Sequence, residues 1–440
     1  MTYENIKTSI LTFLVLLSGL LTWNIWTYQP NYERMENQKT VGEVSLGSKK
    51  EIRKIVKPHQ VIYHIDGKQF GTVENTHIDQ MINTMSKWKF YDVKKYPGRL
   101  VSFNENILHG GNTEIIFPDE VPIELYKRVL NIDDKDLPKF DFDRIIIQTQ
   151  TQQKQEGIIY FYSQKNQQVY ESNVNPSYIN EFAGQFYKTA GRLMPFFQYD
   201  VSATRRIYLP ADDIEMVKYT YYRNPLEAEK FKEALFKDPS FVQRSVVSEY
   251  SEEYMDDASK MTVDNATNMI YYVNPIRDRE SVIGTSNVLQ KSIEFVNSHG
   301  GWTGSYRYVN KDDFNQKVLF RLYSKEGYPV FNQTGMSEIY QQWGQTEISR
   351  YIRPGFDLEL PLNPDVKTKK LHSGYEALEL LEQKRDFKPE LLQNLMPGYY
   401  MIQASGDSPL IQLEPGWFYL YEQQWRQLVW EEEELNNGLE

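Results

Sequence analysis

The stretch SILTFLVLLSGLLTWNIWTY, residues 9–28, decides how the chain is organised. It carries no charge, and its centre, residues 10–21, is almost entirely aliphatic. As a helix, twenty residues rise about 30 Å, which is the thickness of the hydrocarbon core of a bilayer. Trp23, Trp26 and Tyr28 cluster at one end, where amphipathic rings prefer the headgroup level. The sequence therefore predicts a transmembrane helix, with these three residues as membrane interface anchors.

A cleaved signal peptide is the alternative interpretation of this stretch. Signal peptides have an apolar run of about 7–15 residues that is followed by small residues at the cleavage site. Here the run is longer and ends in Trp-Asn-Ile-Trp-Thr-Tyr, which offers no such site. Lys7 favours a cytoplasmic N-terminus, although Arg34 and Lys39 weaken this bias. We expect an uncleaved, single-pass helix in the cell membrane, with the bulk of the chain extracytoplasmic.

The expected membrane helix has a candidate face for a partner helix. Thr12, Val15, Gly19 and Thr22 fall near one side at steps of three and four residues. Small and hydroxyl-bearing residues let two helices approach closely in lipid. Because such residues are also common in membrane helices without partners, the sequence alone supports both interpretations of this face.

Acidity is confined to the part of the chain that follows the apolar stretch. The net charge is -11 at pH 7, and residues 1–30 contribute nothing to it because Glu4 and Lys7 cancel. A surface of this sign repels nucleic acid and other polyanions, so we expect no nucleic-acid partner. Since the chain has no cysteine, it can form neither disulfides nor a lipid anchor on cysteine.

The body of the chain is expected to be an α+β protein of antiparallel sheets packed with helices. Asp66-Gly67 separates two strand-like runs, residues 61–65 and 69–73, and this dipeptide is a strong hairpin signal. A helix is expected from Thr76, because apolar residues then recur at three- and four-residue steps. Further strands are expected at 114–117, 144–148, 158–162 and 168–172, and a second helix at 176–193. These elements define an N-terminal α+β domain at residues 50–210.

Two further domains are expected, a middle α+β domain at 211–345 and a C-terminal β-rich domain at 346–440 with an acidic tail. The middle domain combines strands at 217–222, 269–273, 304–309 and 318–324 with helices at 224–236 and 286–298. The last domain combines a helix at 373–384 with strands at 399–403, 410–413 and 417–423. Residues 1–30 form a short cytoplasmic tail and the membrane helix, and residues 31–49 form a linker.

No constellation of catalytic or metal-binding residues stands out. The six histidines lie more than four residues apart, which disfavours a zinc site. The acidic pairs, such as Asp133-Asp134 and Asp312-Asp313, lie beside turns or helix starts, and none has the spacing of a calcium loop. The chain lacks the G-x-S-x-G, Walker A and G-x-G-x-x-G motifs. We therefore expect no enzymatic activity, no cofactor and no metal.

Aromatic residues are dense near the C-terminus. In a strand, Trp417, Tyr419 and Tyr421 would share one face, opposite Phe418 and Leu420. One of the two faces belongs to a core. The other is a possible aromatic interaction face for sugars or a protein partner, although packing against a neighbouring sheet is the more common outcome for such strands.

Several segments resemble the YycH family along essentially the whole chain. They are Glu4-Asn-Ile-Lys-Thr8, Thr22-Trp-Asn-Ile-Trp-Thr-Tyr-Gln-Pro30, Ala234-Leu-Phe-Lys-Asp-Pro239, Tyr272-Val-Asn-Pro275, and Gly327-Tyr-Pro-Val-Phe331 with Gly335 and Trp343-Gly344. The resemblance implies a single-pass membrane protein with an extracytoplasmic α/β body. It also implies action, together with a sister protein YycI, on the WalK (YycG) sensor histidine kinase of the WalKR system, which governs cell-wall metabolism. No catalytic residue is carried over with the resemblance.

Two hypotheses of different classes follow. The first is a non-enzymatic, membrane-anchored regulator of the sensor kinase that acts with a YycI-like partner through transmembrane and extracytoplasmic contacts. The alternative is an extracytoplasmic module that binds the envelope or senses a ligand, with the C-terminal aromatic residues in contact with that ligand.

Overall fold

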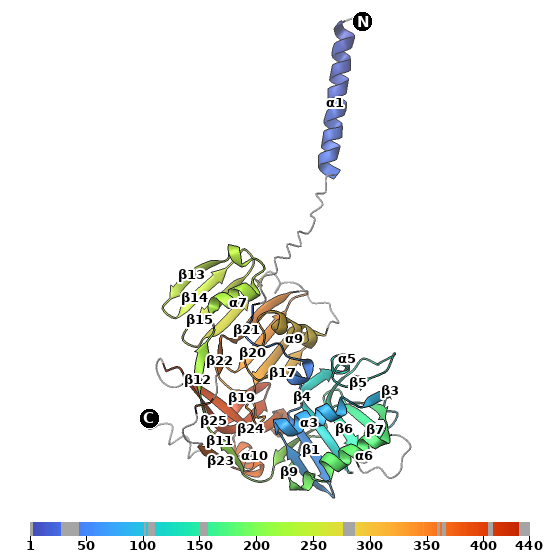
Figure 1. Cartoon of the computed structure of the whole chain (residues 1–440), viewed down its shortest axis with the longest axis vertical. Helices are drawn as coiled ribbons and strands as arrows, with labels where there is room; N and C mark the ends of the chain where they lie inside the picture. Colours follow the sequence, from blue (N-terminus) through green and yellow to red (C-terminus); the bar gives the residue numbers. More distant parts are fainter. Residues whose placement is uncertain are drawn as a thin grey trace. The chain divides into compact units, whose positions relative to one another are not determined.

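Figure 1 shows the computed structural model of the chain. It describes residues 3–27, 44–100, 103, 111–149, 157–275, 287–345, 347–358, 361–362, 367–403 and 408–430, and in the first range it describes the side chains of residues 11–23. The predictions for Tyr28, for the side chain of Trp26, for most of the linker and for the acidic tail at 431–440 therefore lie outside the described residues.

The chain consists of two compact units, Met1–Glu43 and Val44–Glu440. The described residues of the first unit form one helix, α1 (Tyr3–Thr27). Among the residues that the structure describes, no helix meets the length and apolarity needed to cross a membrane. The second unit, which we call the body, contains all the described strands.

A ten-stranded sheet forms the N-terminal part of the body, at the lower right of Figure 1. All its pairings are antiparallel except the one between β3 and β5. In spatial order the strands are β10 (Arg205–Pro210), β9 (Met194–Ser202), β2 (Lys68–Thr72), β1 (Gln60–Ile65), β4 (Asn112–Pro122), β6 (Asp141–Gln148), β7 (Gly157–Ser163), β8 (Gln168–Val174), β3 (Lys89–Lys95) and β5 (Asn131–Ile132).

Helices cover one face of this sheet. Helix α3 (Asn75–Met85) buries Ile78, Met81, Ile82 and Met85, which confirms the periodic face expected from the sequence. Trp88 lies beyond its end and stacks on Tyr178 of the next covering helix, with ring centroids 5.9 Å apart. The remaining helical segments of this part are α2 (Ile52–Ile55), α5 (Ile123–Tyr126), α6 (Pro176–Phe182), the π-helical turn η1 (Ala183–Tyr187) and the 3-10 turn η2 (Ala190–Arg192).

An eight-stranded antiparallel sheet forms the second large part of the body. Its strands, in spatial order, are β13 (Gln243–Ser248), β14 (Ser251–Met255), β15 (Lys260–Asp264), β16 (Met269–Val273), β21 (Ile348–Pro354), β20 (Glu338–Trp343), β18 (Lys317–Leu322) and β17 (Tyr306–Asp312). Helices α7 (Ala228–Leu235) and α9 (Val288–Ser298) bury their apolar residues beside it, followed in the first case by the 3-10 turn η3 (Pro239–Phe241). Trp343 fixes α9 to the sheet by donating from Nε1 to Ser292 Oγ at 2.9 Å.

A six-stranded sheet completes the body. Its strands are β19 (Val330–Phe331), β24 (Leu392–Gln403), β25 (Leu410–Tyr421), β12 (Tyr219–Pro225) and β22 (Phe356–Leu358), with β26 (Gln424–Leu428) paired to β25. A separate two-stranded sheet pairs β11 (Ile214–Val217) with β23 (Thr368–Leu371). Helix α10 (Gly374–Glu382) begins with a capping box between Ser373 and Glu376, and η4 (Pro389–Leu391) precedes β24. The α+β class with mostly antiparallel sheets is therefore confirmed.

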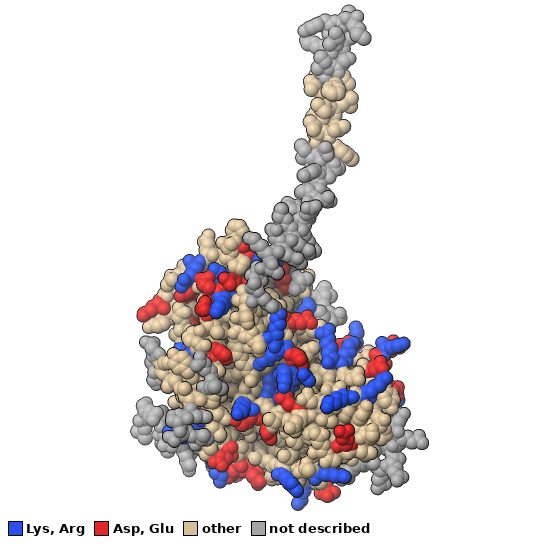
Figure 2. All heavy atoms as spheres, viewed as in Figure 1, with Lys and Arg blue, Asp and Glu red and all other residues tan. Residues whose placement is uncertain are grey.

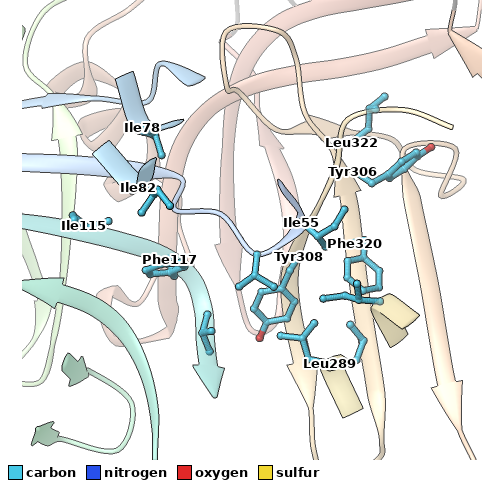
Figure 3. Packing of buried hydrophobic residues seen from close by; sticks show 14 of the residues in the cluster. Ile55, Ile78, Ile82, Ile115, Phe117, Leu289, Tyr306, Tyr308, Phe320 and Leu322 are labelled. Carbon is cyan, nitrogen blue, oxygen red and sulfur yellow. The ribbon is translucent and has the colours of Figure 1, made fainter. Parts of the chain in front are cut away.

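One apolar core runs from the ten-stranded sheet into the eight-stranded sheet. Figure 3 shows Ile55 lying beside Tyr308 and Phe320, with Ile82 and Phe117 on the side of the ten-stranded sheet. Ile55, Tyr308 and Phe320 are all fully buried. We call this boundary between the ten-stranded sheet and the rest of the body the seam.

Three local expectations were wrong for identifiable reasons. Asn224-Pro225 does not open a helix, because β12 continues to Pro225 and α7 begins only at Ala228. The helix expected at 176–193 ends at Phe182 and continues as the turns η1 and η2. The runs at 410–413 and 417–423 form one strand, because β24 provides a long partner that pairs across Pro415 and Gly416.

Strands cross the expected domain boundaries in the C-terminal half. Strand β12, from the expected middle domain, pairs with β25 of the expected C-terminal domain. Conversely, β21 of the expected C-terminal domain pairs with β16 of the expected middle domain. Contacts unite all of Val44–Glu440 into one unit. The division at residues 210 and 345 therefore stays a prediction from the sequence.

Candidate interaction site

The helix face predicted to bind a partner lies in α1. At 100° per residue, Thr12, Val15, Gly19 and Thr22 fall within an arc of about 80°. A Cβ atom added at Gly19 would meet no other atom within 4 Å. The Thr22 hydroxyl donates to Ser18 O at 2.8 Å, so its hydrogen bond is made inside the helix. The face thus presents small or internally satisfied side chains, and its role in partner binding stays a prediction.

Of the expected membrane anchors, only Trp23 has a described side chain, and it is 73% exposed. Most of the large apolar residues from Leu11 to Leu21 are exposed as well. An exposed apolar helix of this kind needs either lipid or another helix to cover it.

The aromatic residues near the C-terminus are core residues. Trp417, Tyr419 and Tyr421 are 0%, 6% and 7% exposed in β25. The indole of Trp417 donates to His372 O at 3.0 Å, and the hydroxyl of Tyr421 accepts from Lys388 N at 3.0 Å. The interpretation of these residues as an exposed interaction face is therefore wrong, and packing explains their density in the sequence.

A short segment near the start of the body is docked on its C-terminal part. Leu46 and Gly47 donate from their backbone nitrogens to Gly300 O at 2.9 and 2.8 Å, and Ser48 exchanges two backbone hydrogen bonds with Trp302. We call residues 46–50 the docked segment. The sequence placed residues 31–49 in a linker, so the end of that range belongs to the folded body instead.

Asn297 of α9 holds the docked segment in place. Its Oδ1 accepts from Lys50 N and from the Trp302 indole, both at 2.9 Å, and its Nδ2 donates to Lys50 O at 2.9 Å. Lys50 also donates from Nζ to Gly304 O at 2.5 Å. The docked segment is therefore held by α9 and by the connection between α9 and β17.

Positive charge gathers directly after this segment. Figure 2 shows Lys and Arg side chains gathered near the middle of the viewed face. Arg53 and Lys54 are half exposed and pair with Glu51 and Asp79, at 2.6 and 3.2 Å. Lys57 is buried and also pairs with Asp79, at 2.7 Å. Residues 50–57 thus carry a local excess of cations in a chain whose net charge is -11.

Asn75 forms a polar bridge across the seam. Its Nδ2 donates to Ser324 O and Lys325 O, at 3.2 and 2.7 Å, and its backbone nitrogen donates to Glu326 O. Its Oδ1 accepts from Arg307 of β17 and from Lys57. Burial, and next the nearby Arg307 charge, lower the pKa of Lys57 to about 8, although Asp79 opposes this.

Carboxylates of the ten-stranded sheet form a second set of contacts across the seam. Asp119 Oδ2 accepts from Lys311 N at 3.1 Å, and Lys311 Nζ donates to Asp141 Oδ2 at 2.7 Å. The Tyr308 hydroxyl donates to Glu120 O at 2.7 Å. Burial raises the pKa of both Asp119 and Glu120 above the usual range, against the hydrogen bonds that they accept.

A buried ion cluster lies within the ten-stranded sheet. Glu114 is fully buried and accepts from His64 Nε2 at 2.8 Å, from Arg144 Nη1 at 2.7 Å and from the Tyr208 hydroxyl at 2.6 Å. Burial alone would raise the pKa of Glu114, but the His64 hydrogen bond and the Arg144 charge outweigh it and hold this pKa well below its usual range.

The cluster shows that the sheet curls. Arg144 of β6 donates to the backbone oxygen of Arg206 in β10 at 2.8 Å, although several strands separate β6 from β10 in the sheet. Tyr208 of β10 likewise reaches Glu114 of β4. Sequence reasoning missed this cluster, and the available signal was a charged residue directly before each of two apolar runs, with Glu114 before 115–117 and Arg144 before 145–147.

The described residues hold no group of three or more His, Asp or Glu side chains arranged to bind a metal ion. His64 contacts Glu114, His77 contacts the Tyr63 hydroxyl, and His299 contacts Phe295 O, so these histidines have structural partners. His109 lies outside the described residues.

Comparisons with known proteins identify the family to which this architecture belongs. A family model described as the YycH protein, N-terminal domain, matches residues 4–190, and one described as the YycH protein, C-terminal domain, matches residues 204–434. The chain belongs to the YycH family.

The YycH relationship extends over nearly the whole chain. Over 435 residues the chain is 25% identical to the two-component system WalR/WalK regulatory protein YycH of Bacillus subtilis (strain 168), which covers 94% of each sequence. The crystal structure of YycH from Bacillus subtilis matches with a TM-score of 0.71 and 19% identity, over 87% of this chain and 98% of that one. The structural likeness shows that the two share a fold.

Proposed function

We propose that this chain is a non-enzymatic, membrane-anchored regulator of a WalK-like sensor histidine kinase that controls cell-wall metabolism. The observation that carries the proposal is the match, over 94% of both sequences, to a protein named as a WalR/WalK regulator. A regulator needs an address and a contact surface, and it needs no nucleophile. To shift a two-state kinase, it must bind one state more tightly than the other, typically by about 1–3 kcal/mol.

The anchor in this proposal is the uncharged stretch at residues 9–28, with the N-terminus cytoplasmic and the body extracytoplasmic. Trp23, Trp26 and Tyr28 would lie at the headgroup level. An anchor confines both partners to two dimensions, so that weak lateral contacts suffice for binding. Extraction of membranes at high pH tests this step, because an anchored chain stays in the pellet and a peripheral one is released.

Kinase contact is proposed to run through the α1 face, together with contacts between the body and a YycI-like membrane protein. The docked segment supports this coupling, since residues 46–50 fix the start of the body to α9 and to the connection between α9 and β17. Arg53 and Lys54, the exposed cations of residues 50–57, provide a local surface that favours an acidic partner segment within an otherwise acidic chain.

Crosslinking in living cells tests the proposal. The full chain is compared with a chimera in which an unrelated membrane helix replaces residues 9–28, and the captured material is probed for the kinase and for the YycI-like protein. Capture of the kinase by the native chain alone would place recognition in α1, and capture by both chains would place it in the body. If neither captures the kinase, the proposal is wrong.

A second comparison separates the helix face from the helix as such. Thr12→Leu with Gly19→Leu adds bulk to the proposed contact face, and we expect it to reduce capture and to change kinase output. Leu14→Phe with Leu21→Phe adds bulk about 160° away from Thr12 and Gly19 and is the matched control. Equal effects of the two pairs would contradict a specific contact face.

A further inference from the structure

A cavity of about 290 Å³ lies in the seam. Its described lining includes no residue of α1, of the docked segment or of the cation-rich residues 50–57. One side is formed by the ends of β1, β2, β9 and β10 of the ten-stranded sheet. The other side is formed by the connection between β18 and β19 and by residues 394–397 of β24. Small-molecule sites occur preferentially at such boundaries between packed parts of a protein.

The walls of the cavity are mostly apolar. The larger apolar side chains among them are Leu193, Met194, Phe196, Ile214, Leu395 and Met396. Tyr328 and Tyr208 add two aromatic rings, and Gly327 brings backbone rather than a side chain to the wall. A wall of this kind binds the hydrocarbon part of a ligand, and its polar groups select the head group.

The charged groups that line the cavity are all acidic, and the neutral polar groups come from His59, Gln60, Thr72, Asn394 and two tyrosines. Glu74, Glu215 and Glu326 line it, and no Lys or Arg is among its described lining residues. The described partners of these three carboxylates are hydroxyl groups, of Thr76, Thr368 and Tyr219 respectively. None of the three makes an ion pair with a described residue, so their negative charge is not neutralised there.

Glu326 is the most constrained of the three carboxylates. Its Oε1 accepts from the Tyr219 hydroxyl, whereas its Oε2 is buried and has no hydrogen-bond partner among the described residues. A buried carboxylate oxygen without a partner costs free energy, so a donor that arrives with a ligand gains more here than at the surface.

His59 contributes no compensating positive charge. Burial, together with the Arg144 and Arg307 charges, lowers its pKa to about 3, so the imidazole is neutral at physiological pH. Its Nδ1 is buried and has no hydrogen-bond partner among the described residues. The cavity therefore combines negative charge, a neutral imidazole and apolar walls.

We propose that this cavity binds a small organic cation, with its ammonium group beside Glu326 and its alkyl or aryl body against Phe196, Leu395 and Met396. The ammonium group provides the donor that Glu326 Oε2 lacks, and the aromatic faces of Phe196 and Tyr328 favour a positive charge nearby. The site is independent of the kinase and membrane contacts proposed above, and it gives the body a ligand-binding capacity of its own.

The test uses the full chain in lipid nanodiscs and two probes of the same shape, 2-phenylethylammonium and its neutral isostere 2-phenylethanol. Binding of each probe is measured by saturation-transfer NMR at pH 7.5, with empty nanodiscs subtracted. We expect the ammonium probe to bind at least about ten-fold more tightly than the alcohol, because a charge-assisted hydrogen bond is added. Equal binding of the two probes, or no saturable binding of either, would overturn the proposal.

Variants locate the site. Glu326→Gln keeps an acceptor for Tyr219 but removes the charge, and we expect it to abolish the preference for the ammonium probe. Met396→Trp fills the cavity and should weaken both probes, whereas Glu249→Gln on the exposed surface should change neither. If Glu326→Gln does not fold, as judged by circular dichroism, Glu215→Gln replaces it and should reduce the preference. Retention of the full preference in the folded carboxylate variant would refute the proposed site.

Discussion

At the scale of single residues, the stability of the ten-stranded sheet depends on a buried ion pair between Glu114 and Arg144. Glu114 and the Arg144 side chain are 0% and 4% exposed, and each is the other's ion-pair partner. Removal of one member of such a pair leaves the other charge buried and uncompensated, which costs about 3–5 kcal/mol. The other hydrogen bonds of Arg144, to Gln164 Oε1 and Arg206 O, go to neutral acceptors and cannot neutralise its charge.

We therefore expect Glu114→Gln to lower the free energy of unfolding of the body by about 3–5 kcal/mol at pH 7. Urea denaturation followed by tryptophan fluorescence measures this difference. Glu249→Gln, at an exposed position, is the control and should change stability by less than about 0.5 kcal/mol. A loss for Glu114→Gln that is no larger than the control would show that the cluster is not held as described.

Asp143 is expected to lower the stability of the body at neutral pH. Burial raises its pKa to about 6, against the Arg144 charge and the Gln164 backbone hydrogen bond, and Glu120 and Asp119 add to the rise. The unfolded pKa is about 3.9, so the fold binds this proton more tightly than the unfolded chain does. The contribution of Asp143 to stability is thus fully present below about pH 4 and is lost as the pH rises to 6.

Asp143→Asn removes this titration while it keeps an acceptor for Gln164. We expect the variant to match the original chain near pH 3.5 and to exceed its stability at pH 7.5 by on the order of 1–2 kcal/mol. Thermal unfolding at a series of pH values follows the difference, with Asp257→Asn as an exposed control. A difference that does not change with pH would count against this account.

At the scale of elements, the docked segment depends on one side chain of α9. Asn297→Ala removes the two hydrogen bonds to Lys50 and the one from Trp302. We expect the amides of residues 46–50 to exchange hydrogen about ten- to hundred-fold faster, which corresponds to about 1.4–2.8 kcal/mol of local stability. Mass spectrometry of exchanged peptides measures this rate.

Ser298→Ala is the matched control for that change, because the Ser298 hydroxyl bonds within its own helix to Glu294 O and Phe295 O. Exchange of the docked segment should be unaffected in this control. If Asn297→Ala left the exchange of residues 46–50 unchanged as well, the segment would be held by its backbone pairing with Gly300 and Trp302 alone.

The connection between β18 and β19 depends on a glycine at the seam. Gly327 has φ +114, and a Cβ there would lie 2.2 Å from the backbone oxygen of Val73. Gly335 has a similar backbone, with φ +81, but a Cβ there would meet only Met269 Cε, at 3.8 Å. The two positions therefore separate backbone strain from steric overlap.

We expect Gly335→Ala to cost about 1–2 kcal/mol from its left-handed backbone. Gly327→Ala should cost about 1–3 kcal/mol more, because the added methyl group must displace the β2 end from the seam. Chemical denaturation of both variants gives the two values. Equal losses of stability in the two variants would show that the seam accommodates a methyl group at position 327 without additional cost.

The elements that sequence reasoning predicted are those with local causes. The helix at residues 75–85 follows from its three- and four-residue periodicity, and the β1–β2 hairpin follows from Asp66-Gly67. The end of β12 at Pro225 depends on its pairing with Phe356, more than a hundred residues away. No periodicity in the sequence carries that information, and the same holds for the pairing of Glu114 with Arg144.

The features of the candidate site also differ in whether the sequence alone could predict them. The small-residue face of α1 can be read from spacing alone, because it needs only one helix. The burial of Trp417, Tyr419 and Tyr421 could not be predicted from spacing, because a strand has two faces and the sequence does not say which of them is covered. The cavity in the seam combines residues from positions 59 to 397, so only the assembled fold reveals it.

At the scale of the whole molecule, the continuity of the core decides how the body responds to force or ligand. A body of nearly 400 residues usually divides into domains that unfold separately. Here one buried cluster spans both sides of the seam, where Ile55 packs beside Tyr308 and Phe320. Asn75 and Lys311 add hydrogen bonds and an ion pair across the same boundary. The two sides therefore stabilise each other.

We accordingly expect residues 44–440 to unfold in a single cooperative transition, with a calorimetric enthalpy equal to the van't Hoff enthalpy. Tyr308→Ala, which empties a fully buried position in the seam, should lower the unfolding temperature of the whole transition without splitting it. Phe103→Ala, in a separate small cluster of the ten-stranded sheet, is a control for loss of a buried ring away from the seam. Two resolved transitions in the original chain would mean that the seam is a joint between independent domains, and a ligand in its cavity would then act by fixing the angle between them.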